Sequence, residues 1–194
     1  MKLIIASNNA HKLTEIKAIL GGMFEEVLSM REAGIDHETV EDGTTFMENA
    51  VKKAREIAEI SGCCAIADDS GICVDALGGA PGIFSARFCG RHGDDQANND
   101  LLLEKLKDTP DSERSAHYTC AIALARPDGS IVKAEGYMYG VIAHEEKGEN
   151  GFGYDPLFIL PQYGKTSAEI SPEEKNRISH RAQALQLLLK ELEK

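Results

Sequence analysis

The sequence lacks several features that would place it in a special class of protein. Its 194 residues contain no window near the roughly 18 consecutive apolar residues that a membrane-spanning helix needs. The apolar run at the start of the chain is too short for a signal peptide. There are no internal repeats, low-complexity segments or obvious linkers, and hydrophobic residues make up 42% of the chain. That share suffices for a buried core and excludes a disordered chain or a coiled-coil rod.

Cysteine is present without a recognisable pattern. None of the five cysteines has C-x-x-C spacing, which argues against a zinc site. An odd number in a chain of this size also argues against a disulfide framework. We therefore expect reduced thiols, in or near the core of a cytoplasmic protein. The five are Cys63, Cys64, Cys73, Cys89 and Cys120.

Positive charge is scarce. The 21 Lys and Arg residues face 32 Asp and Glu residues, so the formal net charge is −11. A nucleic-acid backbone or an anionic membrane repels such a surface. We expect neither a nucleic-acid polymer nor a membrane as partner, although the same net charge allows a local basic pocket for a small anion.

Hydrophobic periodicity predicts helices mixed with hairpin-like strands, and hence an α/β fold with a mixed sheet in a single domain, residues 1–194. Segment 64–74 is predicted as a strand, an acidic turn and a second strand. A cap at Thr44 or Thr45 and the stop at Gly62 delimit the longest predicted helix. The other predicted strands cover 2–6, 26–30, 115–125, 131–143 and 157–160, and the other predicted helices cover 11–20, 94–107 and 179–192.

The first candidate for binding is the polar segment between the first strand and the first helix. It reads Ser7-Asn8-Asn9-Ala10-His11-Lys12. The backbone N–H groups and the dipole of a helix start favour an anion, and Lys12 adds a positive charge. The segment is not a Walker A loop. Taken alone, the segment is better explained as a plain polar turn with an Asn cap, because such turns are common connectors.

The second candidate is the acidic pair Asp68-Asp69, followed by Ser70-Gly71. Adjacent carboxylates repel unless a cation neutralises them, and Mg²⁺ prefers oxygen ligands. One Asp has the chemistry to hold a metal or to polarise water for attack on phosphorus. Because neighbours on a strand point to opposite faces, both need not reach one site. The alternative is a surface turn.

Three further segments carry candidate residues. The acidic stretch Glu38, Glu41 and Asp42 offers a second metal ligand or a solvated loop, and Lys52-Lys53 offers a phosphate contact or a solvated helix face. The segment 151–156, Gly-Phe-Gly-Tyr-Asp-Pro, is either an aromatic platform for a base or a turn with two aromatic plugs. Lys175 and Ser179-His180-Arg181 supply donors at the start of the last helix, or simply an ordinary amphipathic helix.

Together, the order and spacing of these motifs resemble the inosine triphosphate pyrophosphatase family, the pyrophosphatases of non-canonical purine nucleoside triphosphates. The resemblance runs from about Lys2 to Leu189. It rests on Ser7-Asn8-Asn9-x-x-Lys12, Phe46-x-Glu48-Asn49-Ala50 with Lys53-Ala54, Ala67-Asp68-Asp69-Ser70-Gly71, the segment from Gly78 to Arg87, the segment from Gly151 to Pro156, and Ser179-His180-Arg181. Many relatives have Thr-Gly-Asn in the first loop, where this chain keeps a hydroxyl in Ser7.

The resemblance implies an elongated mixed α/β fold with two lobes around a central nucleotide-binding cleft. It implies a soluble cytoplasmic homodimer that hydrolyses ITP, dITP and XTP to the monophosphate and pyrophosphate with Mg²⁺. Asp69 becomes the general base, and Glu41 and Asp69 become the metal ligands, although Glu38 and Asp42 stay open as alternatives to Glu41. The implied substrate contacts are Ser7, Asn8, Asn9, Ala10, His11, Lys12 and Lys53 for the triphosphate, Ser70, and Phe152, Gly153, Tyr154, Asp155, Lys175, His180 and Arg181 for the base.

A mechanism follows as a hypothesis. Lys12 and Lys53 hold phosphate oxygens while Asp69, or Asp68 as second choice, activates the water that attacks the α-phosphorus. Donors on His180 and Arg181 favour the O6 acceptor of hypoxanthine and xanthine over the amine of adenine. Rival interpretations are a pyrophosphatase of pyrimidine triphosphates or GTP, a nucleotide sensor without turnover, and a purely structural α/β domain.

Overall fold

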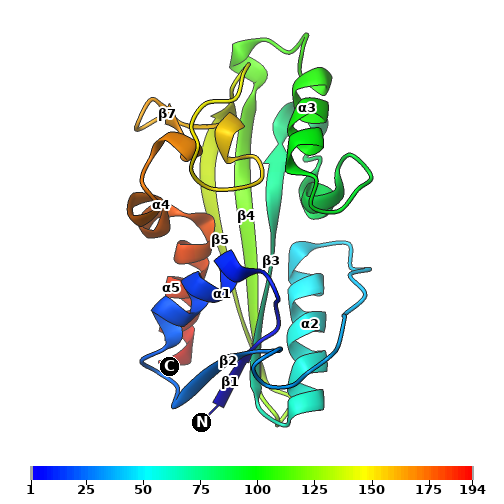
Figure 1. The fold of residues 1–194 in the computed structure, drawn as a ribbon, viewed down its shortest axis with the longest axis vertical. Helices are drawn as coiled ribbons and strands as arrows, with labels where there is room; N and C mark the ends of the chain where they lie inside the picture. Colours follow the sequence, from blue (N-terminus) through cyan, green and yellow to red (C-terminus); the bar gives the residue numbers. More distant parts are fainter. Residues whose placement is uncertain (1, 194) are drawn as a thin grey trace. The chain divides into compact units, whose positions relative to one another are not determined.

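A computed structural model describes residues 2–193 and shows a sheet with flanking helices (Figure 1). The strands are β1 (Lys2–Ile5), β2 (Glu26–Ser29), β3 (Cys64–Val74), β4 (Ser115–Ala125), β5 (Ile131–Ile142), β6 (Phe158–Leu160) and β7 (Lys165–Thr166). The α-helices are α1 (Ala10–Leu20), α2 (Phe46–Ser61), α3 (Asp95–Lys105), α4 (Pro172–Ile178) and α5 (His180–Leu192).

The strands form one mixed sheet. Its hydrogen-bonded order is β2-β1-β3-β4-β5-β6-β7. Strand β1 runs parallel to both of its neighbours, whereas β6 runs antiparallel to β5 and to β7. The mixed sheet with its flanking helices confirms the predicted α/β class.

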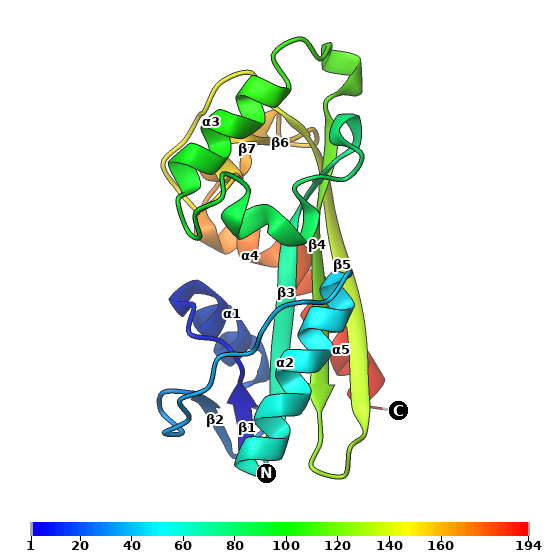
Figure 2. The same ribbon diagram turned by 90° about the vertical axis from the view of Figure 1, so that its right-hand side faces the viewer.

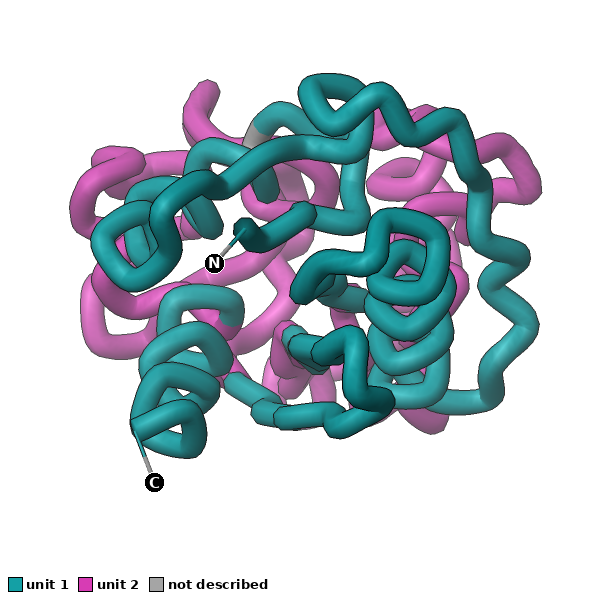
Figure 3. Tube along the Cα trace, turned by 90° about the horizontal axis from the view of Figure 1, so that it is seen from below, with its two compact units in different colours: residues 1–69, 120–136, 181–194 teal, residues 70–119, 137–180 magenta. Residues whose placement is uncertain are grey.

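The chain divides into two compact units (Figure 3). Unit 1 comprises the described residues up to Asp69, Cys120–Gly136 and the described residues from Arg181 onward, and unit 2 comprises Ser70–Thr119 and Tyr137–His180. Strands β3, β4 and β5 contribute residues to both units. The single domain and the central cleft stay predictions.

In unit 1, helices α1 and α5 cover one face of the sheet and α2 covers the other (Figures 1 and 2). The period of two along each strand sends alternate side chains to the two faces. Larger side chains meet α1 and α5, namely Leu3, Ile5, Ile66, Ile122 and Leu124. Small ones meet α2, namely Ala65, Ala67, Ala121, Ala123 and Ala125, opposite Ala50, Ala54 and Ala58. The alanines let α2 approach the sheet closely.

Helix α2 shows why the predicted helix boundaries hold. The Thr45 hydroxyl accepts the Glu48 N–H at 3.1 Å, and the Glu48 carboxylate accepts the Thr45 N–H at 3.3 Å. This reciprocal cap satisfies two backbone donors that the first turn leaves without partners. Gly62 ends the helix in the left-handed region, with φ 64°, as the sequence predicts.

Three local predictions need correction. The predicted turn at Asp68-Asp69-Ser70-Gly71 is wrong, because these residues lie in the middle of the continuous, 11-residue strand β3. The sequence suggested a turn because paired acids and glycine are rare in buried strands, but cationic side chains neutralise the acids here. Helix α4 and the two-residue strand β7 were not predicted, since neither is long enough to show a period.

Unit 2 has a separate hydrophobic core. It gathers aromatic and aliphatic side chains from strands, α3 and the segment before β6, namely Ile72, Leu102, Leu106, Tyr118, Met138, Tyr154, Leu157, Phe158 and Leu160. All five cysteines lie in the described part of the chain, and none forms a disulfide, as predicted. Among the described helices, none is both long and apolar enough to cross a membrane.

Candidate functional site

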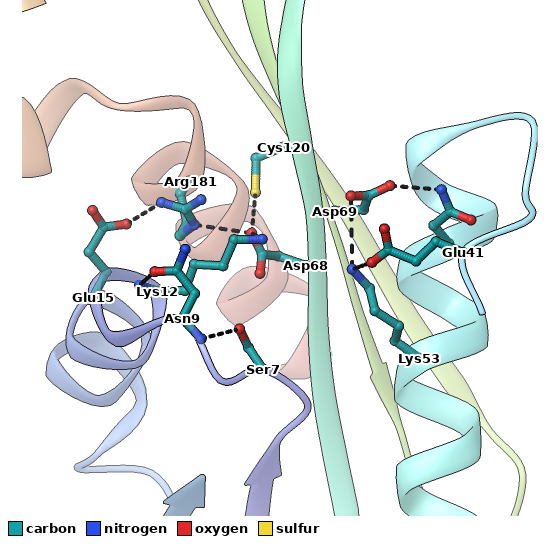
Figure 4. A network of polar contacts seen from close by, with 11 residues as sticks. Ser7, Asn9, Lys12, Glu15, Glu41, Lys53, Asp68, Asp69, Cys120 and Arg181 are labelled. Atoms are coloured by element: carbon teal, nitrogen blue, oxygen red, sulfur yellow. Dashed lines mark hydrogen bonds and ion pairs between the residues drawn. The ribbon is translucent and has the colours of Figure 1, made fainter. Parts of the chain in front are cut away.

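The two neighbouring acids of β3 point to opposite faces of the sheet in unit 1 (Figure 4). The side chain of Asp68 joins residues from α1 and α5, and the side chain of Asp69 joins residues from α2. The alternation that sorts the core therefore also sorts the charges. Each acid has its own partners.

Asp68 is the centre of a buried ionic network. It is 2% exposed, and its Oδ2 lies 3.0 Å from Lys12 Nζ and 3.2 Å from Arg181 Nε. Arg181 Nη1 donates to Glu15 Oε2 at 2.7 Å, and the Cys120 thiol donates to Asp68 Oδ2 at 3.9 Å. Asp68 Oδ1 has no hydrogen-bond partner among residues 2–193.

The cations decide the ionisation of Asp68. Burial by itself would raise the pKa of this carboxyl, but Lys12, Arg181 and Lys53 outweigh burial and hold the pKa well below its ordinary value of 3.8. Asp68 is therefore ionised at neutral pH, and a carboxylate with a lowered pKa is a poor proton acceptor. The base assignment itself stays a prediction, in which Asp69 is the first choice.

The first loop presents Lys12 from the start of α1. The Ser7 hydroxyl accepts the Asn9 N–H at 3.1 Å, and the Asn9 Oδ1 accepts the Lys12 N–H at 3.3 Å. Asn8, Asn9 and Ala10 are exposed, so their polar groups are accessible to a ligand. The loop has the geometry of an anion site at a helix N-terminus. The side chain of His11 lies outside the described part of the structure.

Asp69 lies in a different cluster, which α2 supplies. Its Oδ2 accepts a hydrogen bond from Asn49 Nδ2 at 2.9 Å, and its Oδ1 lies 3.8 Å from Lys53 Nζ. Lys53 Nζ also pairs with Glu41 Oε1 at 2.6 Å. Two carboxylates therefore face one ammonium group, as Figure 4 shows.

Asp69 has the electrostatics of a proton acceptor. Burial raises the pKa of its carboxyl above 3.8, and Glu41 adds to the rise, although Lys53 and the Asn49 hydrogen bond oppose it. Burial tends to lower the pKa of Lys53, but Asp69, Asp68 and Glu41 together raise it, so Lys53 stays charged. A raised carboxyl pKa beside a fixed cation is common at catalytic sites.

A hydrogen bond joins the acidic loop to α2 and so restrains the position of Glu41. Asn49 Oδ1 accepts the Gly43 N–H at 2.8 Å, so the Asn49 amide links this loop to Asp69. A Cβ on Gly43 would lie 2.6 Å from Asn49 Oδ1, so a residue with a side chain at this position would clash with the Asn49 amide. Asp42 instead pairs with Lys52 on the exposed side of α2. Glu41 is therefore the acid of this loop that shares a partner with Asp69.

In unit 2, the loop of residues 151–155 surrounds the buried carboxylate of Asp155, which is 2% exposed. Asp155 Oδ2 accepts the Phe152 N–H at 2.9 Å and an ion-paired hydrogen bond from Lys175 Nζ. Lys175 Nζ also lies 5.0 Å from the centroid of the Phe152 ring. Asp155 is a predicted base contact, and its carboxylate here organises the loop around it.

The aromatic side chains of unit 2 have different degrees of exposure. Tyr154 is buried and its hydroxyl donates to the Ser85 carbonyl at 2.8 Å, so it anchors the loop. Phe152 is 37% exposed and offers a ring surface. His180 is 7% exposed and stacks on Tyr118, with ring centroids 4.8 Å apart. Phe152 thus presents a ring surface, with the Lys175 ammonium beside it.

The comparisons with known proteins cover nearly the whole chain. The model of the Ham1 family matches residues 3–191. This chain belongs to the Ham1 family. The family assignment confirms the resemblance drawn from the motifs.

Individual relatives of the Ham1 chain agree in length and fold. A protein of Leuconostoc mesenteroides named dITP/XTP pyrophosphatase is 53% identical, and the match covers 99% of this chain and 96% of that protein. A protein of the same name from Clostridium perfringens is 51% identical over 96% of this chain and 95% of that protein. The solved Ham1 protein of Staphylococcus aureus is 42% identical, with a TM-score of 0.91 over 100% of this chain and 98% of that chain.

Sequence reasoning had missed three members of the Ham1 site. Asn49 donates to Asp69 and the Cys120 thiol donates to Asp68, whereas Glu15 accepts from Arg181, the partner of Asp68. Asn49 had a detectable signal, because it stands four residues before Lys53 and so shares its helix face. Glu15 and Cys120 contact the site only through tertiary packing. Ser70 lies next to Asp69 in β3 and is partly exposed.

Proposed function

We propose that this chain hydrolyses non-canonical purine nucleoside triphosphates, such as dITP, XTP and ITP, to the monophosphate and pyrophosphate. The relatives named above carry the substrate class in their names. The observation that carries the chemistry is the split acid pair of β3. Asp68 is neutralised by Lys12 and Arg181, and Asp69, with its raised pKa, lies beside Lys53 and Glu41.

In the proposed mechanism, Lys12 and the first loop bind oxygens of the triphosphate, and Lys53 neutralises charge on the reacting phosphate. Asp69 accepts a proton from the water that attacks the α-phosphorus, and pyrophosphate leaves. Asn49 holds the Asp69 carboxylate in one orientation through its 2.9 Å hydrogen bond. Orientation of a base by a neighbouring donor is a usual requirement of general base catalysis.

The donor set near Asp69 fits Mg²⁺. Residues 2–193 contain no cluster of three or more His, Cys, Asp or Glu side chains that would hold a metal by themselves. Mg²⁺ commonly binds through one or two carboxylates and completes its shell with water and substrate phosphates. Glu41 and Asp69 supply two such carboxylates that face one cationic group. When bound there, Mg²⁺ would offset negative charge on the phosphates.

We propose that the base binds at the loop of residues 152–155 with Lys175 and His180. The exposed ring of Phe152 supplies a stacking surface and Lys175 a donor beside it. Arg181 stays a predicted base contact, and its Nε and Nη1 here bind Asp68 and Glu15. A 6-keto purine would satisfy donors that the amine of adenine leaves without a partner.

The test is pyrophosphate release from ITP, XTP, dITP, GTP, ATP, CTP and UTP, with Mg²⁺ and with EDTA. We expect metal-dependent turnover of ITP, XTP and dITP, with kcat/KM for ATP lower by roughly 10²-fold or more. Equal kcat/KM values for ITP and ATP would contradict the proposed base site. Tight binding of ITP without turnover would indicate a sensor instead.

Two further proposals rest on the family resemblance. We propose a homodimer and a cytoplasmic location for this chain. Sedimentation of the purified protein near the mass of two 21.1 kDa chains would support the dimer. Sedimentation as a single chain at micromolar concentration would contradict it.

A further inference from the structure

Two side chains of helix α3 form hydrogen bonds with Gly153, in the loop proposed to bind the base. Asp95 Oδ2 accepts the Gly153 N–H at 2.8 Å, and Asn99 Nδ2 donates to the Gly153 carbonyl at 3.1 Å. Asp95 and Asn99 stand four residues apart and so share one face of the helix. Both backbone polar groups of Gly153 therefore bind side chains from a segment more than 50 residues away in the sequence.

The loop needs anchoring from outside itself. Gly151 and Gly153 have φ values of +80° and +61°, in the left-handed region that glycine adopts readily. Phe152 stands between them, and a residue flanked by two glycines has little backbone restraint of its own. Asp155 and Lys175 hold the N–H and the ring of Phe152. The α3 pair holds the peptide that follows the ring.

The burial of Asn99 argues for a specific role. Asn99 is 3% exposed, and its Oδ1 has no hydrogen-bond partner in the described part of the chain. A buried acceptor without a partner is destabilising relative to an apolar side chain of the same shape. The hydrogen bond from Asn99 Nδ2 to the Gly153 carbonyl offsets this cost.

We propose that Asp95 and Asn99 are positioning residues for nucleobase recognition. They hold Gly153 so that the Phe152 ring has one orientation, and so they act on the base and not on the phosphates. This role rests on the proposed function of the loop. An ordinary helix-start carboxylate would instead stabilise α3 through the helix dipole alone.

The first experiment uses a fluorescent reporter of loop mobility that does not require enzymatic turnover. The chain has no tryptophan, so Phe152→Trp creates a single indole on the loop. In this background, we expect Asp95→Ala to increase acrylamide quenching of the indole by roughly twofold and to lower its anisotropy, because one hydrogen bond to a charged group is lost. Gln96→Ala is the matched control, because Gln96 contacts Asp100 and Glu146 and not the loop.

The kinetic arm uses the chain with Phe152 intact. We expect Asp95→Ala to raise KM for ITP about tenfold and to leave kcat within about threefold, since a charge-assisted hydrogen bond is lost away from the reacting atoms. Inhibition by inorganic tripolyphosphate should be unchanged. Asp95→Asn keeps an oxygen acceptor for the Gly153 N–H and should restore KM to within about threefold of the original value.

The outcomes separate this inference from the proposed function. If Asp95→Ala behaves like Gln96→Ala in both quenching and KM, the positioning role is wrong even though ITP is hydrolysed. An equal loss of ITP and tripolyphosphate binding would also overturn it. If the loop loosens in Asp95→Ala but the parent chain does not hydrolyse ITP, the positioning of the loop is upheld and the proposed function fails. Asn99→Ala should likewise increase the quenching and raise KM for ITP. If Asn99→Ala does not fold, the variants at the exposed Asp95 still test the proposal.

Discussion

The α1–α5 side and the α2 side of β3 place adjacent aspartates in opposite electrostatic environments. Asp68 meets Lys12 and Arg181 at 3.0 and 3.2 Å, and its pKa falls. Asp69 has one cation at 3.8 Å, which it shares with Glu41, and its pKa rises. The same residue type thus has a lowered pKa on one face and a raised pKa on the other, and only the second suits the proton acceptor that we propose.

The comparison also separates stability from activity. A buried ion pair loses most when one partner is removed, because the other charge stays in the interior. A carboxyl with a raised pKa is held in its charged form against the preference of its surroundings. Substitution at Asp68 should therefore affect folding, and substitution at Asp69 should affect turnover.

The largest expected effect is on turnover in Asp69→Asn. The amide has no basic oxygen, so kcat for ITP should fall by roughly 10²–10⁴-fold, the usual contribution of a general base. Because the substitution removes a disfavoured buried charge, the free energy of unfolding should stay equal to that of the parent chain or exceed it. Near-normal kcat with intact Mg²⁺ affinity would show that Asp69 is not the base.

The second effect is on stability in Asp68→Asn. Arg181, 2% exposed, would lose its ionised partner at 3.2 Å, so we expect a loss of about 3–5 kcal/mol in the free energy of unfolding. Urea unfolding at pH 7, with Asp69→Asn as the matched control, measures it. The same midpoint in Asp68→Asn as in the parent chain would contradict the comparison.

The pH dependence of the free energy of unfolding gives a second test of the Asp68 ion pairs. The folded pKa of Asp68 lies below its ordinary value of 3.8, so the unfolded chain takes up the proton first. The contribution of Asp68 is complete above 3.8 and is lost as the pH falls toward the folded pKa. Below about pH 4, the free energy of unfolding of Asp68→Asn should therefore decline less steeply with falling pH than that of the parent chain.

The smallest effects compare the adjacent lysines Lys52 and Lys53, which pair with adjacent acids, Asp42 and Glu41. The Lys53 side chain is 13% exposed and the Lys52 side chain 33%. Lys53→Met should lower kcat/KM for ITP by roughly 10–100-fold, because a charge-assisted phosphate contact is lost. Lys52→Met should leave kcat/KM within about twofold and stability within about 0.5 kcal/mol. Equal kinetic effects of the two substitutions would argue against a specific role for Lys53.

Local patterns carried much of the prediction of the fold. The capping residues and glycine stop of α2, the helical period of α5 and the apolar runs of β1 and β4 all lie within short windows of sequence. The prediction for the acidic segment of β3 is wrong, because a local pattern cannot show countercharges that are distant in the sequence. Lys12 lies 56 residues before Asp68, and Arg181 lies 113 residues after it.

Some features of the candidate site can likewise be predicted from local sequence, and others depend on the tertiary structure. The sequence by itself determined which residue types carry the chemistry, since carboxylates, lysines and an aromatic loop stand at recognisable spacings. It also determined that Asp68 and Asp69 must diverge if they lie on a strand, because the side-chain period of a strand is two. Only the tertiary structure decided which acid becomes the neutralised anion, since packing of α1 and α5 on one face and α2 on the other sets how many cations each acid meets. Charge strength depends on distance and burial, and both are properties of the folded chain.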